Sequence, residues 1–157
     1  MTVSAPDTSS PDTEARKRVA GLLARASREE LTGAWDALTT KPDYTPVRGP
    51  ETGLVMVRGR IGGGGGPFNL GEATVTRATV LLASGIAGHA HALGTDKPKV
   101  RLAAVFDALW QDGETRSFVE SAILAPVEAR IAEQDRQQAE ETAATRVDFF
   151  TMVRGDD

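Results

Sequence analysis

The chain has 157 residues, of which 40% are hydrophobic and 25% are charged, and its formal net charge at pH 7 is −4. This length and composition predict one globular domain that buries a core without disulfides. The acidic balance excludes a general nucleic-acid binder, which needs a cationic surface. Because the chain has no cysteine, thiolate catalysis, a disulfide framework and a cysteine-based zinc site are also excluded.

Residues 1–12 are polar and rich in Pro, Ser and Thr, which predicts a disordered tail before a single domain over residues 13–157. The tail lacks the basic and apolar regions of a signal peptide. No apolar run approaches the ~18 residues that suggest a membrane span. We therefore expect a cytoplasmic chain with neither membrane nor nucleic acid among its partners.

Two helices are predicted next. The first begins near residues 11–13 and carries an apolar face at helical spacing, made by Val19, Leu22, Leu23 and Ala26. Ser27 and Glu30 then form a capping-box pattern, in which the hydroxyl and the carboxylate satisfy free backbone N–H groups. This pattern opens a second helix whose apolar face is made by Leu31, Ala34, Trp35 and Leu38. The front of the domain is thus expected to be a helical hairpin.

Short runs rich in Val, Thr and Leu follow, separated by Gly or Pro. Such runs with brief connections are typical of an antiparallel meander, and Ser84-Gly85 suits a tight turn between the last two. The predicted strands cover residues 44–48, 53–61, 72–82 and 86–93. We therefore predict an α+β fold with an antiparallel sheet of about four or more strands.

The C-terminal half is predicted to be mostly helical. Asp96 suits an N-cap with Pro98 in the first turn, before an apolar stripe made by Leu102, Val105, Phe106, Leu109 and Trp110. Ser117 and Glu120 form a second capping-box pattern. Pro126 is expected to kink or restart the helix that this pattern opens.

The last segments are expected to contact a partner. Residues 127–143 are helical in pattern but poor in apolar side chains, as in a helix that lies along a surface or reaches another protein. The terminal residues read as a strand with two apolar faces, which is typical of a strand buried on both sides. The residues expected to bind a partner are Val127, Ile131, Val147, Phe149, Phe150, Met152 and Arg154.

Five consecutive glycines between two predicted strands raise the question of phosphate binding. A P-loop needs a following Lys and helix, and a Rossmann loop needs a following helix, so both are excluded here. A flexible hairpin loop is the simpler interpretation; the alternative is an anion-binding nest of loop amides and nearby arginines. That alternative site would consist of Arg58, Arg60, Gly62, Gly63, Gly64, Gly65, Gly66 and Arg77.

Metal and nucleophile chemistry find little support. His89 and His91 share one face of their predicted strand, with Cα atoms about 6.5–7 Å apart. Carboxylates would have to complete a metal site, because these are the only two histidines of the chain. Exposed or hydrogen-bonded histidines are the simpler interpretation. No G-x-S-x-G elbow or triad context is present, so neither a metal ligand nor a catalytic residue is predicted.

Three stretches together resemble the PhnG subunit family of bacterial carbon–phosphorus lyase. They are ETGLVMVRGRIGGGGGPFNLGEATVTRATV, GTDKPKVRLAAVFDALWQ and ATRVDFFTMVRGD, and the resemblance extends from about residue 15 to the C-terminus. One departure is at residues 94–97, where the family pattern often reads G-R-D-K and this chain reads G-T-D-K. A contact made by that arginine would be altered here.

The resemblance implies a role in using phosphonates as a phosphorus source. Family members assemble with H-, I- and J-type subunits in the cytoplasm, and the complex transfers a phosphonate to the ribose C1 of ATP with release of adenine. The I-type subunit is taken to carry that chemistry and to be the chief partner, while ATP is a substrate of the complex and no cofactor is bound by this chain alone. The resemblance carries no catalytic residue to this chain.

Three functional hypotheses therefore stand. The chain is an accessory, non-catalytic subunit that is inactive in isolation; or it binds phosphate or nucleotide directly through the glycine loop and its arginines; or it is a self-associating binding module without an enzymatic link.

Overall fold

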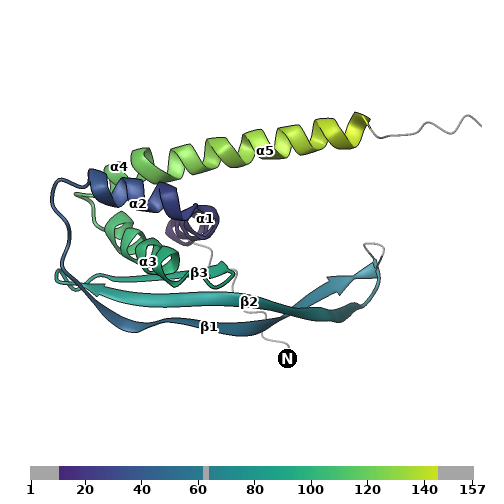
Figure 1. The fold of residues 1–157 in the computed structure, drawn as a ribbon, viewed down its shortest axis with the longest axis horizontal. Helices are drawn as coiled ribbons and strands as arrows, with labels where there is room; N and C mark the ends of the chain where they lie inside the picture. The colour runs from purple at the N-terminus through teal and green to yellow at the C-terminus, as the bar shows by residue number, and fades with distance from the viewer. Residues whose placement is uncertain (1–10, 62–63, 145–157) are drawn as a thin grey trace, which may run out of the picture.

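The computed structural model describes residues 11–61 and 64–144. Helices cover one face of a three-stranded antiparallel sheet, so the fold has two layers (Figure 1). The predicted α+β class is confirmed. The final strand expected after residue 144 lies outside the described residues.

The helical hairpin at the front is confirmed, with α1 at Pro11–Arg25 and α2 at Arg28–Ala37. The first helix thus begins inside the segment 1–12 that was expected to be a tail. The capping box is also confirmed: the Glu30 backbone N–H donates to Ser27 Oγ at 3.1 Å, and the Ser27 N–H donates to Glu30 Oε2 at 2.7 Å. This reciprocal pair satisfies two backbone donors that the start of a helix leaves open.

The sheet has the strand order β1-β2-β3, with β1 at Tyr44–Arg60, β2 at Pro67–Leu82 and β3 at Ala87–Leu93. The prediction of about four or more strands is corrected to three within residues 11–61 and 64–144. Residues 44–48 and 53–61 were expected to be separate strands, but they belong mainly to β1, which stays paired with β2 through register shifts between Pro46 and Glu51. Such bulges bend a strand without ending it.

The turn between β2 and β3 lies where the sequence placed it. The Gly85 N–H donates to the Leu82 carbonyl at 2.9 Å, and Gly85 has φ +90°, a conformation that L side chains rarely adopt. A glycine is therefore needed at this position for the hairpin to close.

The C-terminal half contains α3 at Lys97–Gln111, α4 at Arg116–Val119, the π-helical turn η2 at Glu120–Leu124 and α5 at Ala125–Ala144. The predicted cap of α3 is confirmed, since the Lys99 N–H donates to Asp96 Oδ1 at 3.0 Å. Pro126 does not start a new helix: the backbone stays helical from α4 through η2 into α5, and Pro126 is the second residue of α5. The π-helical turn directly precedes it, and such turns are a usual site of irregularity within a helix.

The second predicted capping box is wrong. Ser117 lies inside α4, which begins after Thr115 without a side-chain cap. Glu120 instead accepts a hydrogen bond from Trp110 Nε1 at 2.8 Å and pairs with Arg18. The Glu120 carboxylate therefore binds Trp110 and Arg18, which are distant in sequence, and does not cap the start of a helix.

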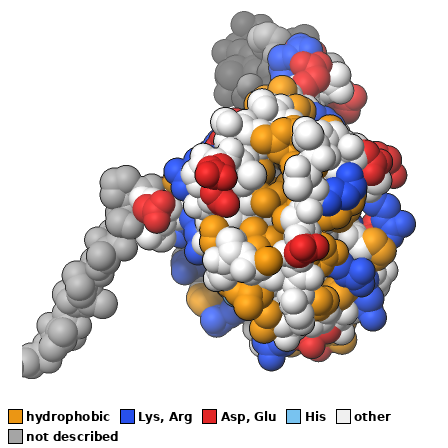
Figure 2. All heavy atoms as spheres, turned by 90° about the vertical axis from the view of Figure 1, so that its left-hand side faces the viewer, with side chains coloured by type: hydrophobic (Ala, Val, Ile, Leu, Met, Phe, Trp, Pro, Cys, Tyr) orange, Lys and Arg blue, Asp and Glu red, His pale blue; other side chains and the backbone are white. Residues whose placement is uncertain are grey.

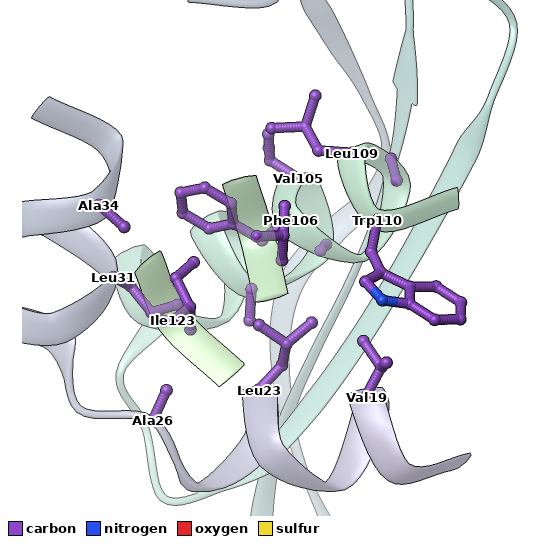
Figure 3. Close-up of a cluster of buried hydrophobic side chains, with 14 of the residues drawn as sticks. Val19, Leu23, Ala26, Leu31, Ala34, Val105, Phe106, Leu109, Trp110 and Ile123 are labelled. Carbon is purple, nitrogen blue, oxygen red and sulfur yellow. The ribbon is translucent and has the colours of Figure 1, made fainter. Parts of the chain in front are cut away.

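The core lies between the helices and the covered face of the sheet. Side chains from α1, α2 and α3 meet around Phe106, and Ile123 of η2 joins them (Figure 3). At β3 the packing leaves no room for a side chain, because a Cβ on Gly88 would overlap the carbonyl oxygen of Ala104. Small residues at this crossing let α3 lie directly on the sheet.

Candidate functional site

The β1–β2 hairpin extends beyond helices α1, α2 and α3 as a projecting arm (Figure 1). Pairing between β2 and β3 ends at Val75 opposite Leu93, whereas β1 and β2 remain paired to Arg60 opposite Pro67. The sheet is therefore two-stranded over residues 54–60 and 67–74, which we call the arm. Isolated two-stranded ribbons are marginally stable in water, so this part of the fold receives little support from the rest of the chain.

Large apolar side chains on the arm are exposed. Their exposed fractions are 64% for Leu54, 46% for Val55, 53% for Met56, 38% for Val57, 39% for Phe68 and 65% for Leu70. Successive strand residues point to opposite faces, so both faces of the arm are apolar. Contiguous exposed apolar surface of this kind marks interaction sites. By contrast, the opposite end of the molecule mixes apolar, cationic and anionic side chains (Figure 2).

None of these arm residues was singled out from the sequence. The signal that would have found them is the run GLVMV at residues 53–57, where apolar side chains occupy consecutive positions rather than alternate ones. A strand with one solvated face shows alternation. Consecutive apolar residues therefore indicate a strand that is apolar on both faces and is buried on both faces when it is packed.

Residues 64–66, the described part of the glycine run, directly precede β2 at the tip of the arm. The Gly65 N–H donates to the Ile61 carbonyl at 3.2 Å, and a Cβ on Gly65 would lie 2.7 Å from that oxygen. Gly62 and Gly63 lie outside the described residues.

Arg58 and Arg60 lie near this loop, two residues apart on β1 and therefore on one face of the ribbon. Neither takes part in an ion pair between described residues, whereas Arg48 on the same strand pairs with Glu51 at 3.4 Å. The tip of the arm thus carries two cationic side chains without a carboxylate partner in the described part of the chain.

Arg77 does not join these arginines, so the predicted cluster is corrected. It lies opposite Glu51 and pairs with that carboxylate at 2.6 Å. Glu51 is seven residues before Arg58 on β1, which corresponds to about 23 Å at the usual rise per residue. The register of the hairpin, which the sequence did not reveal, sets this separation.

His89 and His91 are exposed on the sheet face away from the helices. The Nδ1 atom of His89 lies 3.1 Å from Thr79 Oγ1, which is the geometry of a nucleophile beside a base. However, Asp107 accepts a hydrogen bond from the backbone N–H of His89 rather than from its imidazole, so this carboxylate does not orient the ring. Within residues 11–61 and 64–144, no group of three potential ligands is arranged to hold a metal.

The base of α5 is fastened to the domain and its far end is exposed. Val127 is buried in the core and Ile131 packs against it, so the structure accounts for this pair without a partner. Residues 132–143 are exposed. The other residues expected to contact a partner, which are Val147, Phe149, Phe150, Met152 and Arg154, lie outside the described residues.

Ion pairs reinforce the base of α5. Arg18 of α1 pairs with Glu128 at 2.9 Å, and Arg130 of α5 pairs with Glu30 of α2 at 2.8 Å. Hydrogen bonding to Arg130, opposed by partial desolvation, lowers the pKa of the Glu30 carboxyl. Hydrogen bonding to Arg18 likewise lowers the pKa of Glu128. These shifts have structural causes and lie away from any candidate reaction centre.

None of the helices in the described part of the chain combines the length and the apolar character needed to cross a bilayer.

A family model described as "Phosphonate metabolism protein PhnG" matches residues 14–155. The chain is also similar to the alpha-D-ribose 1-methylphosphonate 5-triphosphate synthase subunit PhnG of Rhizobium meliloti (strain 1021), with 66% identity over 136 residues. That alignment covers 87% of this chain and 86% of the relative.

Proposed function

Because this chain belongs to the family of the phosphonate metabolism protein PhnG, we propose that it is an accessory subunit of the carbon–phosphorus lyase core complex. In this proposal it supports the ribose 1-methylphosphonate 5-triphosphate synthase step without supplying catalytic groups. The observation that carries the proposal is the 66% identity to a synthase subunit over most of both chains.

The described residues support a non-catalytic role. The half-buried hydroxyl of Thr79 lies beside the exposed imidazole of His89, and no described carboxylate orients that ring. The apolar surface of the arm, in contrast, is what a subunit that works by contact with others would present. We expect H-, I- and J-type subunits as companions in the cytoplasm, with the I-type subunit as the chief partner.

The reaction of the complex is a substitution at the ribose of ATP. A phosphonate oxygen forms a bond to C1 of the ribose while the bond from C1 to the adenine nitrogen breaks, and adenine leaves with a proton. In this proposal ATP is a substrate of the complex, and the I-type subunit carries the reacting groups. This chain then contributes assembly and positioning of that subunit.

Omitting the chain from a reconstituted complex tests this proposal. The H-, I- and J-type companions from the same organism would be co-expressed with and without it, and adenine released from ATP in the presence of methylphosphonate would be measured by chromatography. We expect release only when the chain is present with its companions, and none from the chain alone. Equal release without the chain, or release by the chain alone, would contradict the proposal.

A direct ligand role is the second candidate, and the lack of carboxylate partners for Arg58 and Arg60 among the described residues favours it. Arginine pairs suit phosphate oxygens. Replacing both arginines with alanine should then weaken ATP binding to the assembled complex, measured by calorimetry, while assembly is retained. Arg48→Ala, whose side chain is already paired with Glu51, is the matched control. Unchanged ATP affinity in the double variant would exclude this role.

The C-terminal residues stay proposed contacts of the I-type subunit. Deleting residues 146–157 should abolish co-purification with that subunit. Co-purification of the truncated and folded chain at the wild-type level would show that these residues are not needed.

A further inference from the structure

The outer edge of β1 changes character along its length. Near the body, register shifts interrupt it between Pro46 and Glu51, and the prolines at positions 46 and 50 have no N–H to donate. Such features keep other strands from pairing with a sheet edge. From Glu51 to Val57 the register is regular and contains no proline.

The regular part of this edge is open. β1 is the outer strand of the sheet, and no other described segment pairs with it on the side away from β2. Its backbone N–H and C=O groups on that side are therefore available to an added strand.

The side chains along this edge favour an apolar occupant. Leu54 and Met56 project from one face of the arm, and Val55 and Val57 project from the other. All four are exposed by more than a third. An added strand would bring side chains alongside both rows, because its own residues alternate with the same period.

The charges at the tip favour an acidic occupant. Arg58 and Arg60 follow the apolar run directly and have no ion-pair partner among the described residues. The arm carries a single carboxylate, that of Glu72, in its described residues. Two arms set edge to edge would thus bring four arginines against two glutamates, since each contributes two and one. This imbalance disfavours a second copy of the chain and favours a companion that supplies carboxylates.

We propose that the open edge of β1 over residues 53–57, up to the register shift between Val57 and Arg58, is completed by an extended segment of a companion subunit, which adds to the sheet as a further strand. The segment has apolar side chains at consecutive positions and a carboxylate that reaches Arg58 or Arg60. This inference rests on the proposed function, since it takes the companions of the synthase complex as the source of the segment.

Lysine substitutions on the arm test the inference. Leu54→Lys and Met56→Lys, combined in the full chain and co-expressed with the H-, I- and J-type companions, should reduce co-purification at least roughly tenfold, because an added strand would bury unpaired ammonium groups. Leu93→Lys is the matched control, since Leu93 is a 76% exposed leucine on the other edge strand. The control should assemble as wild type does. Circular dichroism of each isolated variant checks that the fold is retained.

Hydrogen exchange provides a second measurement that needs no variant. Within residues 53–57, the backbone amides that point away from β2 should exchange at least roughly tenfold more slowly in the assembled complex than in the isolated chain, because an added strand bonds them. Unprotected amides in the complex, or wild-type assembly of the lysine variant, would overturn the inference and leave the proposed function standing. Protection already present in an isolated dimer would assign the edge to a second copy and overturn it too. Failure of the wild-type chain to assemble at all would instead count against the proposed function.

Discussion

One end of β2 lies under the helices of the body and its other end lies on the arm, where no described helix packs against it. Val80, near the helices, is 1% exposed, while Leu70 on the arm is 65% exposed. Both are aliphatic residues of one continuous strand. In the body, helices α1 to α3 bury the apolar side chains; on the arm, no described element does. The comparison shows that the body is stabilised within the chain, whereas the arm presents apolar surface that its own domain leaves uncovered.

The largest effect expected from this difference is on folding stability. Phe106→Ala removes a fully buried ring from the core and should lower the free energy of unfolding by about 3–5 kcal/mol. Phe68→Ala on the arm, where the ring is 39% exposed, should cost less than about 1 kcal/mol. Urea denaturation of the isolated chain measures both. Similar losses would mean that the arm is as well packed as the body.

A buried carboxylate in the body gives the next contrast. Asp107 is 2% exposed and accepts hydrogen bonds from Arg16 at 3.1 Å and from the His89 backbone at 2.8 Å. Asp107→Ala leaves these donors without their partner and should cost about 1–3 kcal/mol. Glu51→Ala removes an exposed carboxylate beside the arm and should cost less than about 1 kcal/mol, because water screens such pairs. Thermal unfolding compares the two, and equal shifts would contradict the expectation.

The two serines of the capping-box patterns allow a comparison between a cap that forms and one that does not. Ser27→Ala breaks an observed capping box and should lower stability by about 1 kcal/mol. Ser117→Ala alters a residue that has the same sequence pattern but lies inside α4, so it should change stability by less than about 0.5 kcal/mol. A loss at Ser117 as large as that at Ser27 would mean that the second pattern acts as a cap in solution.

The smallest expected effect is a pH dependence at the base of α5. Bonding to Arg130 lowers the pKa of Glu30 in the folded chain, so this carboxyl stabilises the fold above its unfolded pKa of about 4.3. The contribution is lost as the pH falls through the lowered folded pKa. Glu30→Gln keeps a capping side chain but removes the charge, and should flatten the stability profile on the acidic side by less than about 1 kcal/mol. The exposed Glu141→Gln is the control, and unfolding followed between pH 6 and pH 3 would show no difference if the pair were weak.

Much of the fold could be predicted because its signals are local. The Ser27 and Glu30 cap, the Asp96 cap and the turn at Gly85 each depend on groups within three residues of one another. The pattern at Ser117 was equally local, and it misled because Trp110 and Arg18 bind Glu120 instead. A local pattern therefore predicts a structure only where no distant group competes for the same atoms.

The candidate site was less predictable because it depends on pairing. Gly49 and the prolines at positions 46 and 50 suggested a boundary between two strands. Instead, β1 is continuous across them and stays paired with β2 through register shifts. Arg77 was expected near Arg58 and Arg60, but hairpin register places it opposite Glu51. The family resemblance, by contrast, was readable directly from the residues, and comparison with known proteins confirms it.

The sequence by itself determined the α+β class, the helix caps at Ser27 and Asp96, the turn and the family, because each depends on neighbouring side chains or on specific strings of residues. Only the tertiary structure decided which apolar residues are covered. The run GLVMV has the composition of a strand buried on both faces, but burial depends on which elements lie against it. Helices α1, α2 and α3 end before the arm begins (Figure 1). Aliphatic side chains are therefore buried in the core at Val80 and exposed at Leu54.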